Sequence, residues 1–207
     1  MDEKNRAERF KFDIHRKRFI ASHGFVRAVL AKYLSVKANE IEYFKGDQGK
    51  PFLSDTNQNK LQFNLSHTQD VAILAVTKSA AVGIDIEHKD RKTDWKGICK
   101  RFFTEPEQQA LFSLPDKQQR NTFFDLWTRK EAYMKVLGTG LSLSPTDFTL
   151  TVFPEKPALI QHHSTKFAPL EQLAFSSIDL PESFSAYSAT LAIASTIVTN
   201  SQFYQFS

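Results

Sequence analysis

Three carboxylates and one lysine stand at spacings that would bring them to a single point. Asp85 and Glu87 lie two residues apart in an apolar run, so their side chains share one face of a predicted strand. Glu131 and Lys135 lie four apart in a helical pattern, so they share one face of a helix. Oxygen ligands of this kind suit a hard divalent cation such as Mg²⁺, and a lysine beside them would meet a phosphate as a point charge. The sequence therefore predicts a metal site made of Asp85, Glu87 and Glu131, with Lys135 facing a phosphate.

Two predicted elements carry these residues. The first is the short strand that begins at Val82, and the second is a long helix over residues 116–135. Gly138 follows the helix closely and favours its end there, because glycine adopts the left-handed conformation without strain. Trp127 lies on the same helix face as Glu131, and we expect it to wedge the helix against the strand.

The segments around this pair have structural signals of their own. Thr104 and Glu107 form a Thr-x-x-Glu capping box, which predicts the start of a further helix. Whether Glu107 also acts beside the carboxylates stays open. Past the long helix, alternating apolar residues predict strands of an antiparallel sheet. These strands cover residues 148–152, 158–161, 173–177 and 185–194.

The chain before the Asp85 strand holds a second group of polar residues. Helical periodicity over residues 19–36 places Arg27 on the flank of a helix. Lys50 follows two glycines in a predicted loop. Residues 61–77 alternate as a β-hairpin, and Ser66 and His67 lie where its first strand is expected to end. Taken singly, each would be an ordinary surface or structural residue, and the charge state of His67 stays open.

Composition narrows the class of protein. A chain of 207 residues with 41% hydrophobic and 24% charged residues can bury a full core as one large or two small domains. Its single cysteine forms no internal disulfide, which fits a reducing cytoplasm. We expect no secretory signal or membrane anchor in the charged first 18 residues. The net charge of +4 favours acidic partners or phosphates in general.

The two motifs together resemble the 4′-phosphopantetheinyl transferases of the surfactin-synthetase-activating type. That family has a Gly-[Ile/Val]-Asp-x-Glu strand, which Gly83, Asp85 and Glu87 match. About forty residues later it has Trp-x-x-Lys-Glu-Ala-x-x-x-Lys. The matching residues here are Trp127, Lys130, Glu131, Ala132 and Lys135. The family's Phe-Asn-[Ile/Leu]-Ser-His motif also occurs in full, over residues 63–67.

The resemblance implies a fold and a set of ligand contacts. It implies an α/β (α+β) protein of two similar halves related by a pseudo-twofold axis, here residues 1–79 and 80–207. Coenzyme A would lie between the halves, against Arg27, Lys50, Ser66, His67 and Lys135. The second half would hold Mg²⁺ through Asp85, Glu87 and Glu131. Asp85, Glu131 and Lys135 would be the catalytic residues.

The implied reaction moves 4′-phosphopantetheine from coenzyme A to a serine of an apo acyl or peptidyl carrier protein, releasing adenosine 3′,5′-bisphosphate. The serine hydroxyl needs a base, which would be Glu131 or a metal-bound water that it orients. Lys135 would stabilise the transferring phosphate. The resemblance further implies an acidic carrier protein as partner, a cytoplasmic monomer, and service to nonribosomal peptide or polyketide synthesis.

Two other functions fit parts of the pattern. Acidic residues and a lysine around Mg²⁺ also suit a nuclease or phosphodiesterase, although nucleases commonly place the lysine two residues after an acid on a strand. A coenzyme-binding or carrier-binding module without turnover is the second alternative, and the intact set of acids argues against it. Neither nucleic acid nor membrane is expected as a partner of the transferase.

Overall fold

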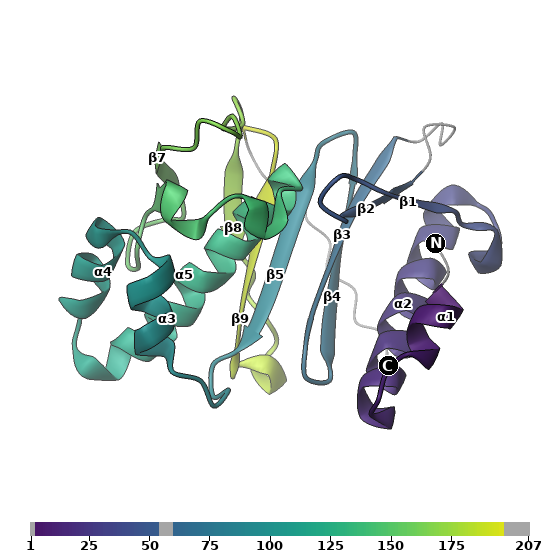
Figure 1. Cartoon of the computed structure of the whole chain (residues 1–207), viewed down its shortest axis with the longest axis horizontal. Helices are drawn as coiled ribbons and strands as arrows, with labels where there is room; N and C mark the ends of the chain where they lie inside the picture. Colours follow the sequence, from purple (N-terminus) through teal and green to yellow (C-terminus); the bar gives the residue numbers. More distant parts are fainter. Residues whose placement is uncertain (1–2, 54–59, 197–207) are drawn as a thin grey trace.

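The computed structural model describes residues 3–53 and 60–196. In Figure 1 the strands of residues 61–88 and 174–193 form the middle of the molecule, with the helices before residue 35 on one side and the helices between residues 95 and 137 on the other. Helices and strands follow one another in separate runs along the chain, so the fold is a mixed α+β fold, as predicted. Four short 3₁₀ helices complete it, at Ala38–Glu40, Gly140–Ser142, Pro145–Asp147 and Glu182–Phe184.

The first half is one long helix packed on a hairpin. Helix α2 (Asp13–Leu34) buries Val26 and Leu30 against Leu61 and Phe63. Those last two residues come from β3 (Leu61–Thr68), which pairs antiparallel with β4 (Val71–Lys78). A short helix, α1 (Glu3–Glu8), precedes α2, and a ribbon of β1 (Tyr43–Lys45) and β2 (Pro51–Leu53) follows it.

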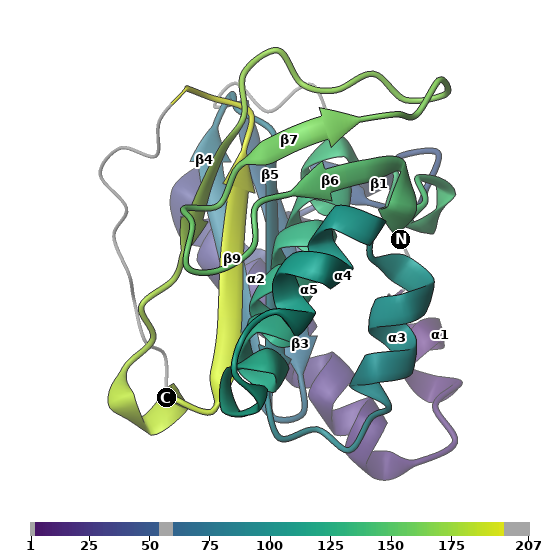
Figure 2. The ribbon, with the colours of Figure 1, turned by 90° about the vertical axis from the view of Figure 1, so that its left-hand side faces the viewer.

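The second half repeats the plan of a 22-residue helix on a sheet. Helix α5 (Asp116–Leu137) lies along β5 (Val82–His88) and β9 (Tyr187–Ile193), and β8 (Ala174–Ser177) completes that sheet. Figure 2 shows α3 (Trp95–Phe102) and α4 (Glu105–Phe112) on the outer side of α5. The pair β6 (Phe148–Leu150) and β7 (Leu159–His162) covers its end.

Gly83 lets α5 lie directly on β5. A Cβ atom at this position would stand 2.1 Å from the carbonyl oxygen of Ala132 and 2.4 Å from the backbone nitrogen of Val136. Such distances are impossible for real atoms, so only glycine permits this approach of helix to strand. The glycine of the predicted strand motif therefore sets the spacing between the two elements that carry the acids.

Most predicted elements are confirmed. Helix α5 ends at Gly138, which has a φ of 71°, and the capping box of Thr104 and Glu107 is present at the start of α4. Helix α2 begins at Asp13, earlier than the predicted Phe19. The sequence pattern does not reveal its first turns, because they are charged and have no apolar period. The four predicted late strands exist, but they divide between two sheets and not one.

The polar segment from His88 to Lys100 begins as a loop, as its composition predicts, and then enters a helix that was not predicted. Helix α3 begins at Trp95, where the Asp94 side chain accepts a hydrogen bond from the backbone of Gly97. Its apolar residues do follow a helical period, since Trp95, Ile98, Cys99 and Phe102 all belong to the core of the second half. Basic residues between these positions hid the pattern.

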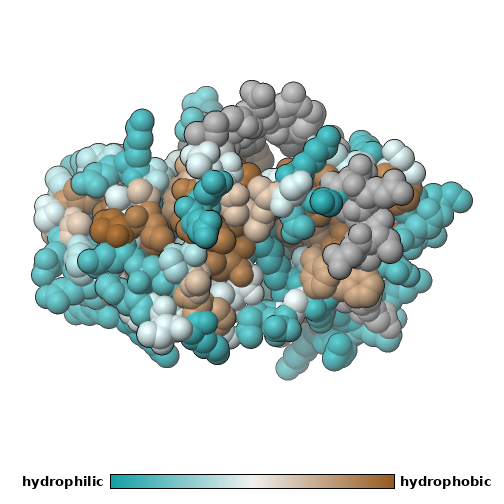
Figure 3. All heavy atoms as spheres, turned by 90° about the horizontal axis from the view of Figure 1, so that it is seen from above, coloured by the Kyte–Doolittle hydropathy of each residue, from teal (hydrophilic) through white to brown (hydrophobic). Residues whose placement is uncertain are grey.

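Hydrophilic side chains cover most of the surface in Figure 3, and hydrophobic ones gather in smaller patches among them. Large exposed apolar residues include Phe44, Phe52 and Leu141. Among the helices of residues 3–53 and 60–196, none is both long and apolar enough to cross a membrane.

Candidate active site

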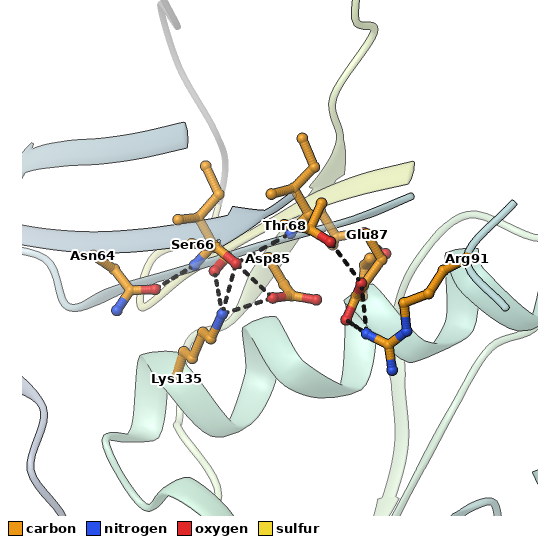
Figure 4. A network of polar contacts seen from close by, with 11 residues as sticks. Asn64, Ser66, Thr68, Asp85, Glu87, Arg91 and Lys135 are labelled. Atoms are coloured by element: carbon orange, nitrogen blue, oxygen red, sulfur yellow. Dashed lines mark hydrogen bonds and ion pairs between the residues drawn. The ribbon is translucent and has the colours of Figure 1, made fainter. Parts of the chain in front are cut away.

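Asp85 is the centre of a polar network between the two halves. Its side chain is 7% exposed, and its Oδ1 atom accepts hydrogen bonds from Ser66 at 2.8 Å and from the Lys135 ammonium at 2.6 Å. Figure 4 shows Asp85 between strand β3 and helix α5. The predicted meeting of the strand end with the helix face is thus present in the structure.

Ser66 uses its whole hydrogen-bonding capacity inside this network. A hydroxyl offers one donor and two acceptor positions. The Ser66 hydroxyl donates to Asp85, and it accepts from Lys135 Nζ at 3.0 Å and from the backbone N–H of Ile86 at 3.4 Å. Lys135 also donates to the carbonyl oxygen of Ile84 at 3.1 Å. In this arrangement Ser66 holds the acid and the lysine together.

Glu87 has a cationic partner of its own. Arg91 Nη1 lies 3.1 Å from both of its carboxylate oxygens, and the Thr68 hydroxyl donates to Oε2 at 3.2 Å. Burial nevertheless raises the pKa of Glu87, with Arg91 opposing that shift and Asp85 adding to it. Glu87 and Asp85 therefore face the same acidic region from alternate positions on β5.

Among the acids of this group, Glu131 has the largest described shift in pKa. Burial raises its pKa to about 7; the charge of Asp85, and more weakly that of Glu87, adds to the shift, while Lys135 opposes it. A carboxyl group that titrates near neutral pH can take up a proton from a hydroxyl group and release it again. Such a shift is also typical of functional sites, where like charges are kept close together.

The donor set fits a hard divalent cation. Asp85 Oδ2 is buried and has no hydrogen-bond partner among the described residues, which leaves an anionic oxygen for a cation. Within residues 3–53 and 60–196, however, no three acidic, histidine or cysteine side chains converge closely enough to hold a metal as they stand. Asp85 and Glu87 are paired with Lys135 and Arg91, so joint ligation requires these side chains to turn from their present partners.

Lys50 connects the halves through backbone carbonyls. Its ammonium donates to the carbonyl oxygen of Val82 at 2.8 Å and to that of Lys135 at 2.6 Å. Burial lowers the pKa of Lys50 to about 8. The Lys50 ammonium therefore binds the start of β5 and the last turn of α5, and it links these two elements. Its predicted contact with the coenzyme stays a prediction.

Arg27 is engaged within the first half. Its Nε atom donates to Glu3 at 2.6 Å, and Nη1 donates to the carbonyl oxygens of Ala38 and Ile41. The guanidinium also lies 4.8 Å from the ring centre of Tyr43. Arg27 thus fixes the turn after α2, and it already carries one anionic partner. Its predicted role as a phosphate ligand stays a prediction.

His67 lies exposed on β3, next in sequence to the buried Ser66. Neighbouring strand residues point to opposite faces, so the two side chains diverge. Packing around the ring lowers the pKa of His67, and the charges of Lys135, His23, Arg18 and Arg6 lower it further. The neutral form of His67 is therefore favoured, and the cations around it make this region favourable for an anion.

Glu107 and Trp127 have structural surroundings. Glu107 and Lys130 form an ion pair of 2.9 Å between side chains that are both 0% exposed. Glu107 also accepts from the backbone N–H groups of Thr104 and Leu150, so its oxygens are occupied away from Asp85. Trp127 packs as a structural residue, but its ring contacts lie on Phe123 and on the end of α3 at Phe102 and Phe103, and not on β5 as predicted.

Comparison with protein families accounts for both halves of the chain. A model described as the 4′-phosphopantetheinyl transferase superfamily matches residues 81–192, which include the whole carboxylate group. A second, described as the N-terminal part of 4′-phosphopantetheinyl transferase, matches residues 1–79. The chain belongs to the 4′-phosphopantetheinyl transferase superfamily. The acids, Lys135 and the Ser66 network thus lie in a phosphopantetheinyl transferase fold.

Individual transferases show the same relationship. The chain is 41% identical over 162 residues to the 4′-phosphopantetheinyl transferase HetI of Nostoc sp.. It is 34% identical over 155 residues to the transferase psf-1 of Bacillus pumilus. These alignments cover 77% and 75% of this chain, and 68% and 64% of the relatives. A putative transferase of Synechocystis sp. is 30% identical, with 57% of its length covered.

Solved structures of the superfamily overlap with about half of the chain. The holo-[acyl-carrier-protein] synthase of Thermotoga maritima has a TM-score of 0.45 and 26% identity, over 55% of this chain and 61% of that one. The synthase of Bacillus anthracis, in complex with CoA (3′,5′-ADP), has a TM-score of 0.44 and 22% identity. That overlap covers 55% of this chain and 93% of the synthase.

The sequence prediction gave no role to three residues of this transferase site. Asn64 accepts the backbone N–H of Ile84, Thr68 donates to Glu87, and Arg91 pairs with Glu87. A signal for the first two was present, because the polar residues at 64, 66 and 68 share one face of the predicted strand. Arg91 lies in a charged turn, and nothing in its sequence surroundings distinguishes it.

Proposed function

We propose that this protein transfers 4′-phosphopantetheine from coenzyme A to a serine hydroxyl of an apo acyl or peptidyl carrier protein. The observation that carries the proposal is the network in which Asp85, Lys135 and Ser66 meet between the halves, with Glu131 beside it. Membership in the superfamily supports the same reaction. The other product is adenosine 3′,5′-bisphosphate.

The chemistry is a displacement at phosphorus. The serine oxygen forms a bond to the phosphorus that carries pantetheine, and the bond from that phosphorus to the 5′-phosphate oxygen of the nucleotide breaks. The hydroxyl proton passes to a base, and the departing phosphate gathers negative charge. Catalysis of this type depends mainly on positioning and on electrostatic stabilisation.

Glu131 suits the role of the base, either directly or through a water that it orients. Its pKa of about 7 means that it is partly ionised at neutral pH and can hold the serine proton. Lys135 lies on the same helix face and would meet the phosphate charge. Since Lys135 now binds Asp85 and Ser66, its ammonium is already directed into the region where phosphate would be transferred.

Mg²⁺ would be held by Asp85, Glu87 and Glu131, and it would neutralise charge on the pyrophosphate. The buried, unpaired Oδ2 of Asp85 supports this ligand set. We further propose that coenzyme A lies between the halves and meets Arg27, Lys50, Ser66, His67 and Lys135. The cations that surround His67 support an anionic ligand there.

Several finer features complete the proposal. The division at residues 79 and 80 is supported by the separate ranges that the two family models match. The two motifs support the surfactin-activating type of transferase. The similarity to HetI supports a HetI-like type equally well. We propose a cytoplasmic monomer whose positive net charge of +4 suits an acidic carrier protein.

Release of adenosine 3′,5′-bisphosphate tests this function. The protein is incubated with coenzyme A, Mg²⁺ and an apo carrier protein, and the nucleotides are separated by chromatography. We expect release that requires both the carrier and the metal. Degradation of plasmid DNA without any release would instead identify a nuclease, and coenzyme A binding without release would identify a binding module.

A further inference from the structure

The edge of β5 that faces the first half is closed by side chains. In the antiparallel pairing of β5 with β9, alternate residues of β5 direct their backbone groups away from β9. On that outer edge, the carbonyl oxygens of Val82 and Ile84 accept hydrogen bonds from Lys50 and Lys135. The N–H groups of Ile84 and Ile86 are bound by Asn64 and Ser66 of β3. We name this set of contacts the β3–β5 seam.

The seam fixes how the two strands are aligned. Asn64 meets Ile84 and Ser66 meets Ile86, so the numbers rise together and the strands run in the same direction. Yet β3 and β5 belong to different sheets. Side-chain hydrogen bonds therefore connect these two strands in place of a backbone hydrogen-bond ladder. The length of the side chains sets the spacing of the strands.

Asn64 has the stronger of the two contacts with the β5 backbone. Its Oδ1 atom lies 2.8 Å from the Ile84 nitrogen, whereas the Ser66 contact with Ile86 measures 3.4 Å. Asn64 is 6% exposed, so water does not easily replace it as a partner. Because buried backbone N–H groups are almost always paired, losing this acceptor would leave Ile84 unsatisfied.

The peptide that Asn64 binds leads directly into the proposed metal ligand. Ile84 precedes Asp85, and its carbonyl oxygen is held by the same Lys135 ammonium that pairs with the Asp85 carboxylate. With Ser66 binding both Ile86 N–H and Asp85 Oδ1, the backbone is fixed on each side of the acid. Figure 4 shows Asn64, Ser66 and Lys135 in this arrangement around Asp85.

We propose that Asn64 is a positioning residue of the transferase. It acts through the Ile84 backbone, so a residue of the first half of the chain orients an acid of the second half. This inference rests on the proposed function for its effect on catalysis. The hydrogen bond itself can be tested without any activity.

The test compares Asn64→Ala with Asn64→Ser in the full chain. Serine should rescue in part, because Ser66, two residues further along the same strand, reaches the corresponding N–H of Ile86 with its hydroxyl. Phe63→Leu is the matched control, since it weakens the core on the opposite face of β3 and leaves the seam intact. The readouts are kcat, KM for coenzyme A, and hydrogen exchange of the Ile84 amide by NMR.

We expect Asn64→Ala to lower kcat by about 10–100-fold, the range seen when outer partners of a metal ligand are lost. KM for coenzyme A should stay within about twofold, and the Ile84 amide should exchange faster than in the wild type. Asn64→Ser should recover part of both, and Phe63→Leu should lose stability but keep kcat.

Three outcomes would overturn the assignment. They are an unchanged kcat with Ile84 still protected, a raised KM with unchanged kcat, and a Phe63→Leu variant as slow as Asn64→Ala at a temperature where both are folded. If Asn64→Ala does not fold, Asn64→Ser carries the test, with intermediate values expected. If the wild type transfers nothing, the proposed function fails, while Ile84 exchange still decides whether Asn64 holds this backbone.

Discussion

At the scale of single residues, the acids divide by what surrounds them. Asp85 and Glu87 each have a cationic partner, in Lys135 and Arg91, while Glu131 is half-buried near both acids and its pKa rises to about 7. Such a group remains protonated in the folded protein at a pH where it is ionised in the unfolded chain. A carboxyl group with such a raised pKa is useful in a site that has to bind a cation or a proton.

Glu131 therefore costs the metal-free protein stability at high pH. Its pKa is higher in the folded state than the ordinary 4.5, so stability falls as the pH rises from about 4.5 to about 7 and stays reduced above that. We expect Glu131→Gln to melt at a higher temperature than the wild type at pH 8, without metal. Thermal unfolding from pH 4.5 to 8 measures this difference, which should vanish at the acid end.

The control for this prediction is Glu155→Gln, which changes the same charge at an exposed position. It should have the same small effect at every pH. A Glu131→Gln variant that is equally stable or less stable at pH 8 would contradict the account. The variant should also transfer little phosphopantetheine, because it lacks the proposed base.

At the scale of elements, the site depends on how closely α5 lies on β5. Gly83→Ala would place a Cβ atom within 2.4 Å of two backbone atoms of the helix, so helix and strand would have to separate. We expect a loss of unfolding free energy at or above the usual ~1–3 kcal/mol of overpacking. Transfer should be almost abolished, because Asp85 and Lys135 would move apart. Urea unfolding measures the first effect.

Gly24 provides a matched control within the same chain. It lies exposed in the middle of α2, and a Cβ atom there would have nothing within 4 Å. Gly24→Ala should therefore stabilise the protein by roughly 0.5–1 kcal/mol, through helix propensity alone. Equal effects of the two substitutions would show that the approach of α5 to β5 is not as tight as described.

At the scale of the whole molecule, polar side chains of the first half hold the elements that carry the chemistry. Lys50 binds both β5 and α5, and Asn64 and Ser66 bind β5 further along the strand. The two halves are thus joined next to the site, where coenzyme A is proposed to lie. Binding of the coenzyme and alignment of the acids would then depend on the same interface.

Lys50→Met separates a bridging role from a role in coenzyme binding alone. Two backbone carbonyls would lose their donor, so we expect a loss of about 1–3 kcal/mol in unfolding free energy without any ligand. The exposed Lys45 gives the control, since Lys45→Met should change stability little. A Lys50→Met variant with wild-type stability and weakened coenzyme A binding would assign Lys50 to the ligand only.

The limits of sequence prediction follow from which contacts are local. Asp85 and Glu87 on one strand, Glu131 and Lys135 on one helix face, and the end of α5 at Gly138 all follow from periods within one element. The partners of Ser66 and Lys50 could not be predicted, because the alignment of β3 against β5 is set by tertiary packing. Glu107 illustrates this limit. Its capping box could be predicted from the sequence, whereas its buried ion pair with Lys130 could not.

The most direct test of the account is the intact mass of an apo carrier protein after incubation with this protein, coenzyme A and Mg²⁺. The account predicts a gain equal to one phosphopantetheine group, which is abolished by a chelator. Asp85→Asn should lower the rate by about 10²–10³-fold, as expected when one electrostatic contact of an active site is removed, and should remain folded. No gain with several carriers, or full activity of Asp85→Asn, would contradict the assignment of these acids to phosphopantetheine transfer.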